Sequence, residues 1–322
     1  MSSTAAPGSV VGGATPRQRL PKFTKRSGWQ AALFIAPAVI LLLALLVYPV
    51  LWTLRLSFDT GRGLEPRKWV GFENYTRLFT EDRRFLNLHE FPPQGALVNN
   101  VLWLVLYTSL CLALGLLIAV LATRVRYEAI IKAIIFVPMA ISAVAVGLIW
   151  KFVYSPDPDI GVLNAIRTGV LSLDAIPFLG REDIVNYSII FAYVWASAGF
   201  AMVVLSAALK GISQEIIEAA RTDGANEWAI FRRIQLPLLA LPISVVTVWL
   251  MINVIKLFDI IYIMTAGGPN GKSQVIAYMM YDQTFNGGKG GYGSAIAVVM
   301  LLLIIPIMVF NIKRFRTQTI QG

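Results

Sequence analysis

Histidine and cysteine are almost absent from this chain. Its 322 residues include one of each, His89 and Cys111. A Cys/His metal cluster therefore cannot be built, and a Ser-His-acid triad would have to use His89, which no nucleophile-elbow motif accompanies. The sequence predicts neither a metal site nor catalytic residues in this chain, because the side chains that such chemistry uses are missing.

Charge is scarce as well. Asp, Glu, Lys and Arg make up 14% of the residues, while 57% are hydrophobic and the mean hydropathy is +0.66. A soluble domain usually carries about a quarter charged residues, and a transmembrane helix needs about 20 consecutive apolar residues. Six charge-free runs fit this requirement: 27–54, 91–123, 133–150, 184–209, 234–255 and 290–312. The sequence predicts an all-α, polytopic membrane protein with six transmembrane helices.

The distribution of basic residues predicts the orientation in the cell membrane. With the N-terminus in the cytoplasm, the inner segments hold 15 Lys and Arg in 72 residues, and the outer segments hold 11 in 105. Cytoplasmic loops carry this kind of excess, so both termini are expected to be cytoplasmic. Residues 1–26 are rich in Ser, Thr, Ala, Gly and Pro and are expected to form a disordered basic tail, with 27–322 as the transmembrane domain. Most of the net charge of +10 would then lie at the cytoplasmic leaflet of the membrane, and it gives no reason to expect a nucleic-acid partner.

One stretch has a sequence similar to a nucleotide-binding motif. The sequence "AGGPNGKS", from Ala266 to Ser273, resembles a phosphate-binding loop. That motif needs a glycine at its first position and lies between a strand and a helix. Here the first position is alanine, a proline lies inside, an apolar run precedes it, and the predicted side is outside the cell. No ATP site is expected in this chain.

Polar residues inside the apolar runs are the candidates for binding a solute, because they are costly in lipid and usually functional. The fourth span contains "FAYVWASAGF", and "WLMINVIKLFDIIY" covers the end of the fifth charge-free run and the residues just after it. Aromatic rings together with amide and carboxylate groups suit a neutral polyhydroxylated solute. The candidate residues are Tyr193, Trp195, Ser197, Phe200, Asn253, Lys256 and Asp259.

Each of these candidates has a simpler interpretation. Lys256 and Asp259 are three residues apart, so on one helix they share a face and could form an ion pair that reaches the outer interface. Tyr193 and Trp195 could belong to an outer aromatic belt.

The polar stretch "EAARTDGANEWAIFRRIQLP", Glu218 to Pro237, predicts a helical elbow. Ser213 is a candidate N-cap for a helix from Gln214 to Asp223, and Gly224 follows where a left-handed residue commonly ends a helix. Asn226 is a candidate cap for a second helix. Ile212, Ile216, Ala219 and Ala220 form a small apolar face that suits a protein groove, although a helix lying on the membrane surface would show the same pattern.

The spacing in this stretch resembles the EAA motif of ABC-importer permeases. The matching positions are Glu218, Ala219, Ala220, Gly224, Ile234, Leu236 and Pro237, with Asp223 beside the glycine. Segments such as "VPMAISAVAVGLIWKFVY" and "LFDIIYIMTAGGPNGKSQVIAYMMYDQTF" are similar to the maltose-type carbohydrate-uptake permeases, and the resemblance covers nearly the whole chain after the tail.

This resemblance implies a type I ABC importer permease subunit that carries a sugar of oligosaccharide or α-glucoside type into the cytoplasm. It implies no cofactor in this chain, since ATP is used by a partner. It also implies a second permease, two cytoplasmic ATPase subunits and an external solute-binding protein. The loop 210–236 would be the coupling element that docks on the ATPase. By the same resemblance the sugar lies where the fourth and fifth spans face each other, where Leu250 and Val254 are apolar in place of the polar groups expected for maltose.

Two alternatives remain at this point. An importer of the same class could carry another solute, such as a glycerol-phosphate ester, although that would favour more positive charge than Lys256 supplies. A membrane scaffold or enzyme without transport would need catalytic residues that the sequence does not offer.

Overall fold

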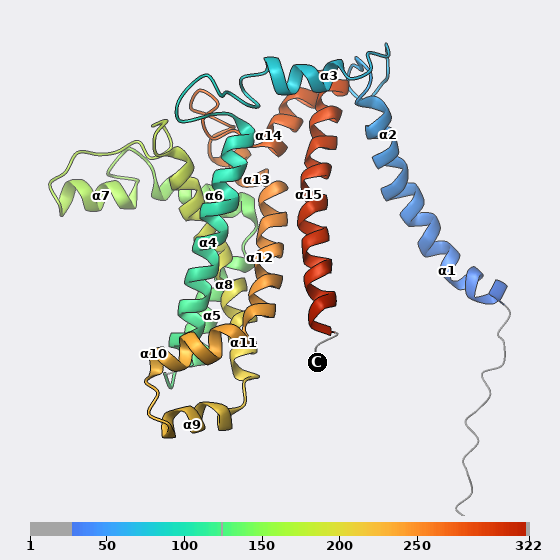
Figure 1. Cartoon of the computed structure of the whole chain (residues 1–322). Helices are drawn as coiled ribbons and strands as arrows, with labels where there is room; N and C mark the ends of the chain where they lie inside the picture. The colour runs from blue at the N-terminus through green and yellow to red at the C-terminus, as the bar shows by residue number, and fades with distance from the viewer. Residues whose placement is uncertain (1–27, 124, 320–322) are drawn as a thin grey trace, which may run out of the picture. The chain divides into compact units, whose positions relative to one another are not determined.

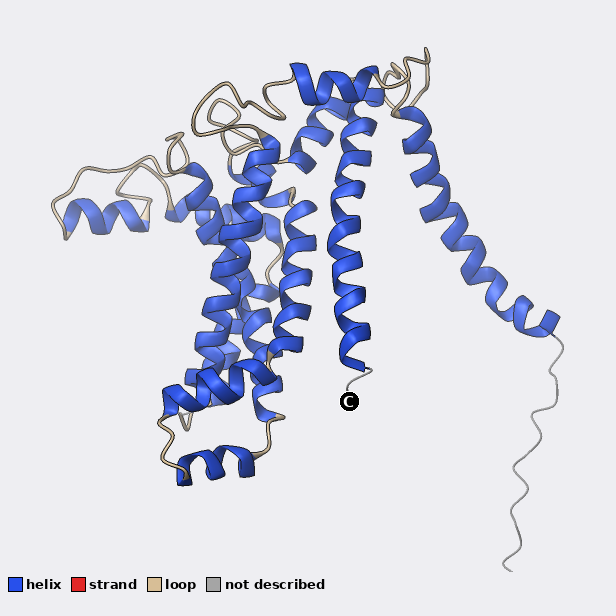
Figure 2. Cartoon of the chain, in the orientation of Figure 1, coloured by secondary structure: helices blue, strands red, loops and turns tan. Residues whose placement is uncertain are grey.

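Helices form the regular structure of residues 28–123 and 125–319, which the computed structural model describes (Figure 1). Within these residues Figure 2 shows helices and loops and no strand. The protein is an all-α membrane protein, as predicted. The tail predicted for residues 1–26 lies outside the described residues.

The chain divides into two units, Met1–Leu51 and Trp52–Gly322. The first contains α1 (Gly28–Leu42) and the π-helical turn η1 (Leu43–Val47), and α2 (Tyr48–Leu56) crosses the boundary. The stretch Ala32–Leu56 has the length and apolar composition of a membrane span, in agreement with the first predicted span.

The second unit holds the remaining helices. Its elements are α3 (Glu73–Thr76), η2 (Arg77–Glu81), α4 (Ala96–Ala122), α5 (Glu128–Phe136), η3 (Val137–Ala140), α6 (Ala143–Val153), α7 (Val162–Gly169), α8 (Val185–Lys210), α9 (Gln214–Thr222), α10 (Glu227–Ile230), η4 (Phe231–Gln235), α11 (Leu236–Leu238), α12 (Ala240–Ile255), α13 (Asp259–Met264), α14 (Ile276–Tyr281), η5 (Asp282–Asn286) and α15 (Gly290–Thr319). In Figure 1, α9 lies at the end of this bundle opposite α3 and α14.

Two of the six predicted spans are bent in the structure. Four described helices are long and apolar enough to cross a membrane, and the number rises to six if each of two bent helix pairs counts as one span. The helix Glu128–Ala140 meets Ala143–Val153 at 101°, and Glu227–Leu238 meets Ala240–Ile255 at 66°. If each pair is one span, the third and fifth predicted spans are broken helices, a form that membranes tolerate where protein covers the freed backbone.

The core forms where α4 packs along α8, the most extensive helix contact in the unit. Gly115 of α4 makes the approach possible, because a Cβ there would lie 2.5 Å from the Cβ of Ala201 and 2.8 Å from the backbone nitrogen of Met202. Trp103, Tyr107 and Cys111, spaced four residues apart on α4, are fully buried in this core. Helices α12, α13 and α6 complete it.

Candidate functional site

A cavity of about 260 Å³ lies beside the point where α12 ends and α13 begins. Its lining residues are Ala143, Tyr193, Asn253, Lys256, Leu257, Phe258, Asp259 and Ile260. This cavity brings together four of the seven predicted solute-binding residues. They are Tyr193 of α8, Asn253 of α12, Lys256 in the break and Asp259 at the start of α13.

The prediction that Lys256 and Asp259 share one helix face is wrong. Helix α12 ends at Ile255, Lys256 has φ −89° and ψ 6°, and α13 begins only at Asp259. Among the described residues no ion pair joins the two side chains, and both are exposed. The break in the helix places backbone and side-chain polar groups next to this cavity.

The break is held by Asn100, a residue that the sequence patterns did not single out. The side-chain amide of Asn100 on α4 donates a hydrogen bond to the carbonyl oxygen of Val254 (3.2 Å), near the end of α12. The backbone N–H of Ile276, at the start of α14, donates to the amide oxygen of Asn100 (2.8 Å). Asn100 is 3% exposed, so it satisfies buried backbone groups at the end of α12 and at the start of α14. The sequence does contain a sign of this role, since two adjacent asparagines, Asn99 and Asn100, lie at the start of an otherwise apolar helix.

The cavity offers both donors and acceptors of hydrogen bonds. The side-chain N–H of Asn253 donates to the carbonyl oxygen of Trp249 (2.8 Å), and within the described residues its amide oxygen receives no hydrogen bond. An ammonium supplies only donors and a carboxylate only acceptors, so Lys256 adds donors to the cavity and Asp259 adds acceptors beside that amide oxygen. Such a set can hydrogen-bond several hydroxyl groups of one solute.

The other three predicted residues lie elsewhere. Trp195 packs its ring against Trp150 of α6, with centroids 5.8 Å apart, and is 39% exposed. Phe200 stacks on Trp249 of α12 at 4.0 Å, which joins the two helices. Ser197 is buried. None of the three lines the cavity beside Asp259.

The predicted elbow is present between α8 and α12. Helix α9 starts at Gln214, Gly224 has φ +83°, and Asn226 caps α10 by accepting a hydrogen bond from the backbone N–H of Ala229 (2.8 Å). Ser213 occupies the N-cap position of α9, but its side chain forms no capping hydrogen bond. The second arm runs through η4 and α11 to Leu238 before it bends into α12. Ile234 lies in η4, and Leu236 and Pro237 lie in α11, so all three belong to this second arm of the elbow.

The EAA-motif residues of α9 face outward. Glu218 and Ala219 are exposed and Ala220 is half-buried, as is Ala225 after the turn. Within the described chain the carboxylate of Glu218 has no hydrogen-bond or ion-pair partner. Ile216 is 47% exposed, whereas Ile217 is buried. The apolar surface that α9 presents is thus formed by Ile216 and Ala219, while Ile212 faces inward.

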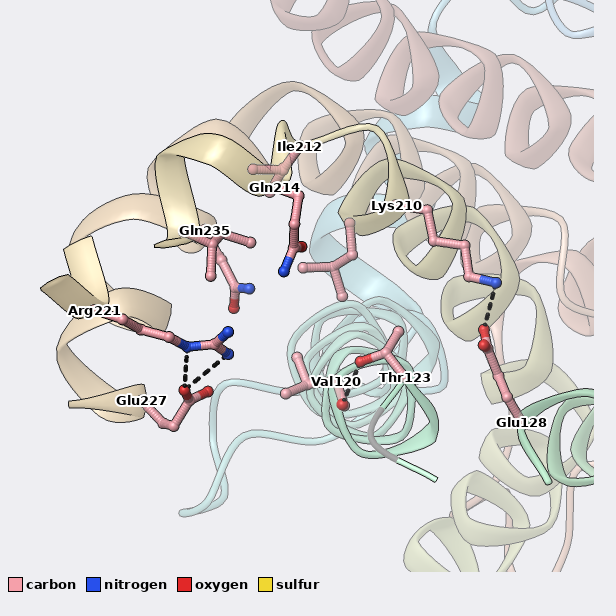
Figure 3. Close-up of a pocket in the computed structure, with 11 residues that line it drawn as sticks. Val120, Thr123, Glu128, Lys210, Ile212, Gln214, Arg221, Glu227 and Gln235 are labelled. Atoms are coloured by element: carbon pink, nitrogen blue, oxygen red, sulfur yellow. Dashed lines mark hydrogen bonds and ion pairs between the residues drawn. The ribbon is translucent and has the colours of Figure 1, made fainter. Parts of the chain in front are cut away.

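Beneath the elbow lies a second cavity of about 650 Å³. It is lined by Val120, Thr123, Glu128, Leu209, Lys210, Ile212, Gln214, Ile217, Arg221, Glu227 and Gln235. Figure 3 shows Gln214, Gln235 and Arg221 directed into it, and the ion pair of Glu128 with Lys210 (2.8 Å) on the side away from the elbow. Because this space separates α9 from the ends of α4 and α8, the main helix contact of α9 is with α10. The elbow is therefore attached to the helix bundle through its two ends, at α8 and α12.

The stretch from Ala266 to Ser273, which resembles a phosphate-binding loop in sequence, forms a connection between two helices. Residues Thr265 to Val275 join α13 to α14, and no helix begins at Lys272 or Ser273. Asn99 donates hydrogen bonds from its side-chain amide to the carbonyl oxygens of Lys272 (2.8 Å) and Gln274 (2.7 Å), which ties the loop to α4.

Comparison with known proteins connects both sites to one family. Residues 112–312 match the family model described as "Binding-protein-dependent transport system inner membrane component". The chain belongs to this family. The matched residues include the elbow and the interruption between α12 and α13. Members are transport components, so the prediction of an ABC permease rather than an enzyme is confirmed.

Individual relatives agree with this assignment. The chain is 46% identical to the osmoprotective compounds uptake permease protein GgtC of Synechocystis sp., over 89% of this chain and 99% of that one. It is 42% identical to the alpha-glucoside transport system permease protein AglF of Rhizobium meliloti, over 87% of this chain and 81% of the relative. A crystal structure of a bacterial ABC transporter for alginate import contains a chain of the same fold (TM-score 0.74, 23% identity, covering 90% of this chain and 96% of that chain).

Proposed function

We propose that this ABC permease subunit moves a neutral sugar of α-glucoside type across the cell membrane through the cavity beside the α12–α13 break. The observation that carries the proposal is the convergence of Tyr193, Asn253, Lys256 and Asp259 on that cavity. An aromatic ring beside hydrogen-bonding groups of both polarities suits a polyhydroxylated solute, and a relative at 42% identity is named for alpha-glucoside transport.

The charges in the cavity argue against a phosphate ester. A phosphate dianion needs clustered positive charge, as arginine and lysine provide in phosphate sites. Here Asp259 lies in the same cavity as Lys256, so the two charges oppose each other's effect on an anion. A second candidate is an osmoprotective solute, because the relative at 46% identity is named for uptake of such compounds.

The elbow is proposed to be the coupling element. It would dock through Ile216, Ala219 and the unpaired Glu218 into a cleft on a cytoplasmic ATPase, with both chain termini on the same side of the membrane. In this proposal a second permease completes the pathway, two ATPase subunits use ATP, and an external binding protein delivers the sugar. Closure of the ATPase dimer would move the elbow as a rigid body and turn the pathway outward.

Uptake by cells lacking the gene tests the substrate class. Radiolabelled trehalose, sucrose and maltose, together with labelled glycerol 3-phosphate, are supplied to deletion cells and to cells that carry the gene again. We expect restored uptake of at least one neutral disaccharide and no change for glycerol 3-phosphate. Restoration of glycerol 3-phosphate alone would contradict the sugar assignment.

A further inference from the structure

Five aromatic rings lie together on residues 258–285, which begin at the cavity beside Asp259. They are Phe258, Tyr262, Tyr278, Tyr281 and Phe285, here called the aromatic row. Phe258 precedes α13 and Tyr262 lies within it, Tyr278 and Tyr281 belong to α14, and Phe285 lies in η5. Phe258 and Tyr262 are four residues apart, Tyr278 and Tyr281 are three apart, and Tyr281 and Phe285 are four apart. These spacings place the rings of each group on one face of a helix.

The aromatic row begins at an exposed ring and ends at the cavity. Phe285 is 60% exposed, and its ring centroid lies 5.2 Å from that of Tyr281. Tyr281 lies 4.9 Å from Phe258, which itself lines the cavity beside Asn253 and Asp259. Two ring-to-ring steps therefore lead from the surface of the protein to the proposed solute site.

The remaining two rings widen this row. Tyr262 stacks on Phe258 with a centroid distance of 5.4 Å and an interplanar angle of 20°, and it is 43% exposed. Tyr278 lies 6.3 Å from Phe258 and is largely buried. Tyr278 thus backs the row, while Tyr262 presents a ring to the outside.

Two hydroxyl groups of the row are free to bind a ligand. In the part of the chain that the structure describes, the phenol oxygens of Tyr262 and Tyr281 take part in no hydrogen bond, and neither side chain is buried. Each phenol can donate one hydrogen bond and accept another. Aromatic faces beside unsatisfied hydroxyls match a pyranose ring, which has an apolar C–H face and a rim of hydroxyl groups.

We propose that the aromatic row is a second sugar-binding surface, which holds pyranose rings after their release outside and passes them to the cavity beside Asp259. This inference rests on the proposed sugar specificity. A lipid-facing aromatic belt would not require a ring that lines a polar cavity, and Phe258 is such a ring.

The test removes rings while keeping apolar volume. Tyr281→Leu and Phe285→Leu are compared with Phe79→Leu as the matched control, because Phe79 is also exposed (46%) and in contact with another ring, Phe85, but lies outside the row. Each variant is purified as the complete transporter complex and reconstituted into liposomes. Uptake of labelled trehalose and maltose, and ATP hydrolysis stimulated by the sugar-loaded binding protein, are measured at saturating binding protein.

We expect Tyr281→Leu and Phe285→Leu to move about two- to tenfold less sugar per ATP, as the loss of one ring contact predicts. ATP hydrolysis and recovery of the complex should be unchanged, and Phe79→Leu should behave as the wild type. Tyr281→Phe should retain most of the uptake. Normal uptake by both leucine variants would overturn the proposal, as would a loss of uptake that is explained by loss of the second permease from the complex.

A binding measurement separates failure of the row from failure of the proposed function. Saturation-transfer NMR on the complex, with maltotriose as the probe, should show transfer to the pyranose C–H protons that falls in Tyr281→Leu. Transfer that depends on Tyr281 without uptake of any sugar would support the row and contradict the proposed function. Uptake with no such dependence would overturn the row alone, and the absence of transfer and uptake together would overturn both.

Discussion

Arg221 and Glu227 hold the two arms of the elbow together across the turn at Gly224. The guanidinium Nε of Arg221 donates a hydrogen bond to Glu227 Oε1 (3.0 Å), and Nη2 lies 3.0 Å from the same oxygen. The first residue belongs to α9 and the second begins α10. This contact links the two arms of the elbow on the side that faces the cavity beneath it.

The ion pair is expected to stiffen the coupling loop only modestly. Both side chains are about half exposed (49% and 48%), and exposed pairs contribute about 0.2–1 kcal/mol. We expect Arg221→Gln and Glu227→Gln each to lower sugar moved per ATP by less than about fivefold. In a double-mutant cycle the combined variant should lose no more than either single variant. Fully additive losses would show that the two residues do not act together.

A larger effect is expected at Gly224. Its φ is +83°, and a Cβ added there would have no atom within 4 Å, so a side chain is disfavoured by backbone strain alone. Gly224→Val should cost about 1–2 kcal/mol and reduce recovery of the ATPase with the permease by roughly five- to thirtyfold. Gly224→Asn is the matched control, because asparagine tolerates the left-handed region. Equal recovery of the ATPase with both variants would contradict this account of the elbow.

Close packing of α4 on α8 leads to a prediction about folding. Gly115→Val places carbon atoms against Ala201 and the backbone of Met202, so one of the helices must shift, at a cost of about 1–3 kcal/mol. We expect the melting temperature of the purified complex to fall. Gly169→Val, where no atom lies within 4 Å of the added Cβ, should leave it nearly unchanged. A fall of the same size in both variants would show that close helix packing at Gly115 is not the cause.

The proposed orientation is tested by labelling single cysteines. Gln214→Cys and Asn270→Cys are made in a background with Cys111→Ser, because Cys111 is buried, and intact cells are treated with an impermeant thiol reagent. Both residues are exposed, so accessibility to the reagent is decided by the side of the membrane. Asn270→Cys should be labelled and Gln214→Cys should react only after the cells are opened. The reverse pattern would invert the topology.

The helical class, the elbow and part of the cavity could be predicted from the sequence, because each depends on local patterns. Apolar runs without charge predict spans, and Gly224 and Asn226 occupy the positions that a turn and an N-cap require. The interruption after Ile255 could not be predicted in this way. The apolar run through Ile255 gives no local signal of a helix end, and the end of α12 is hydrogen-bonded by Asn100, which is more than 150 residues away in the chain. For the same reason the sequence wrongly predicts that Lys256 and Asp259 share one helix face.

The packing of the aromatic residues was also beyond the sequence. Trp195 and Phe200 have the aromatic rings that a sugar site needs. In the structure, however, the ring of Trp195 packs against Trp150 and the ring of Phe200 stacks on Trp249. Which of several aromatic residues faces a cavity depends on the rotation of neighbouring helices, and a single sequence does not specify that rotation.

Transport by cavity variants of the complete transporter tests the central claim most directly. Asn253→Ala and Asp259→Asn are compared with Asp157→Asn, an exposed carboxylate outside the cavity, in proteoliposomes supplied with the binding protein and labelled trehalose and maltose. The account predicts that both cavity variants assemble with their partners and hydrolyse ATP, but move roughly tenfold less sugar, as the loss of about 1–2 kcal/mol from a hydrogen bond implies. Assembly and sugar uptake at the wild-type rate in both cavity variants would contradict it.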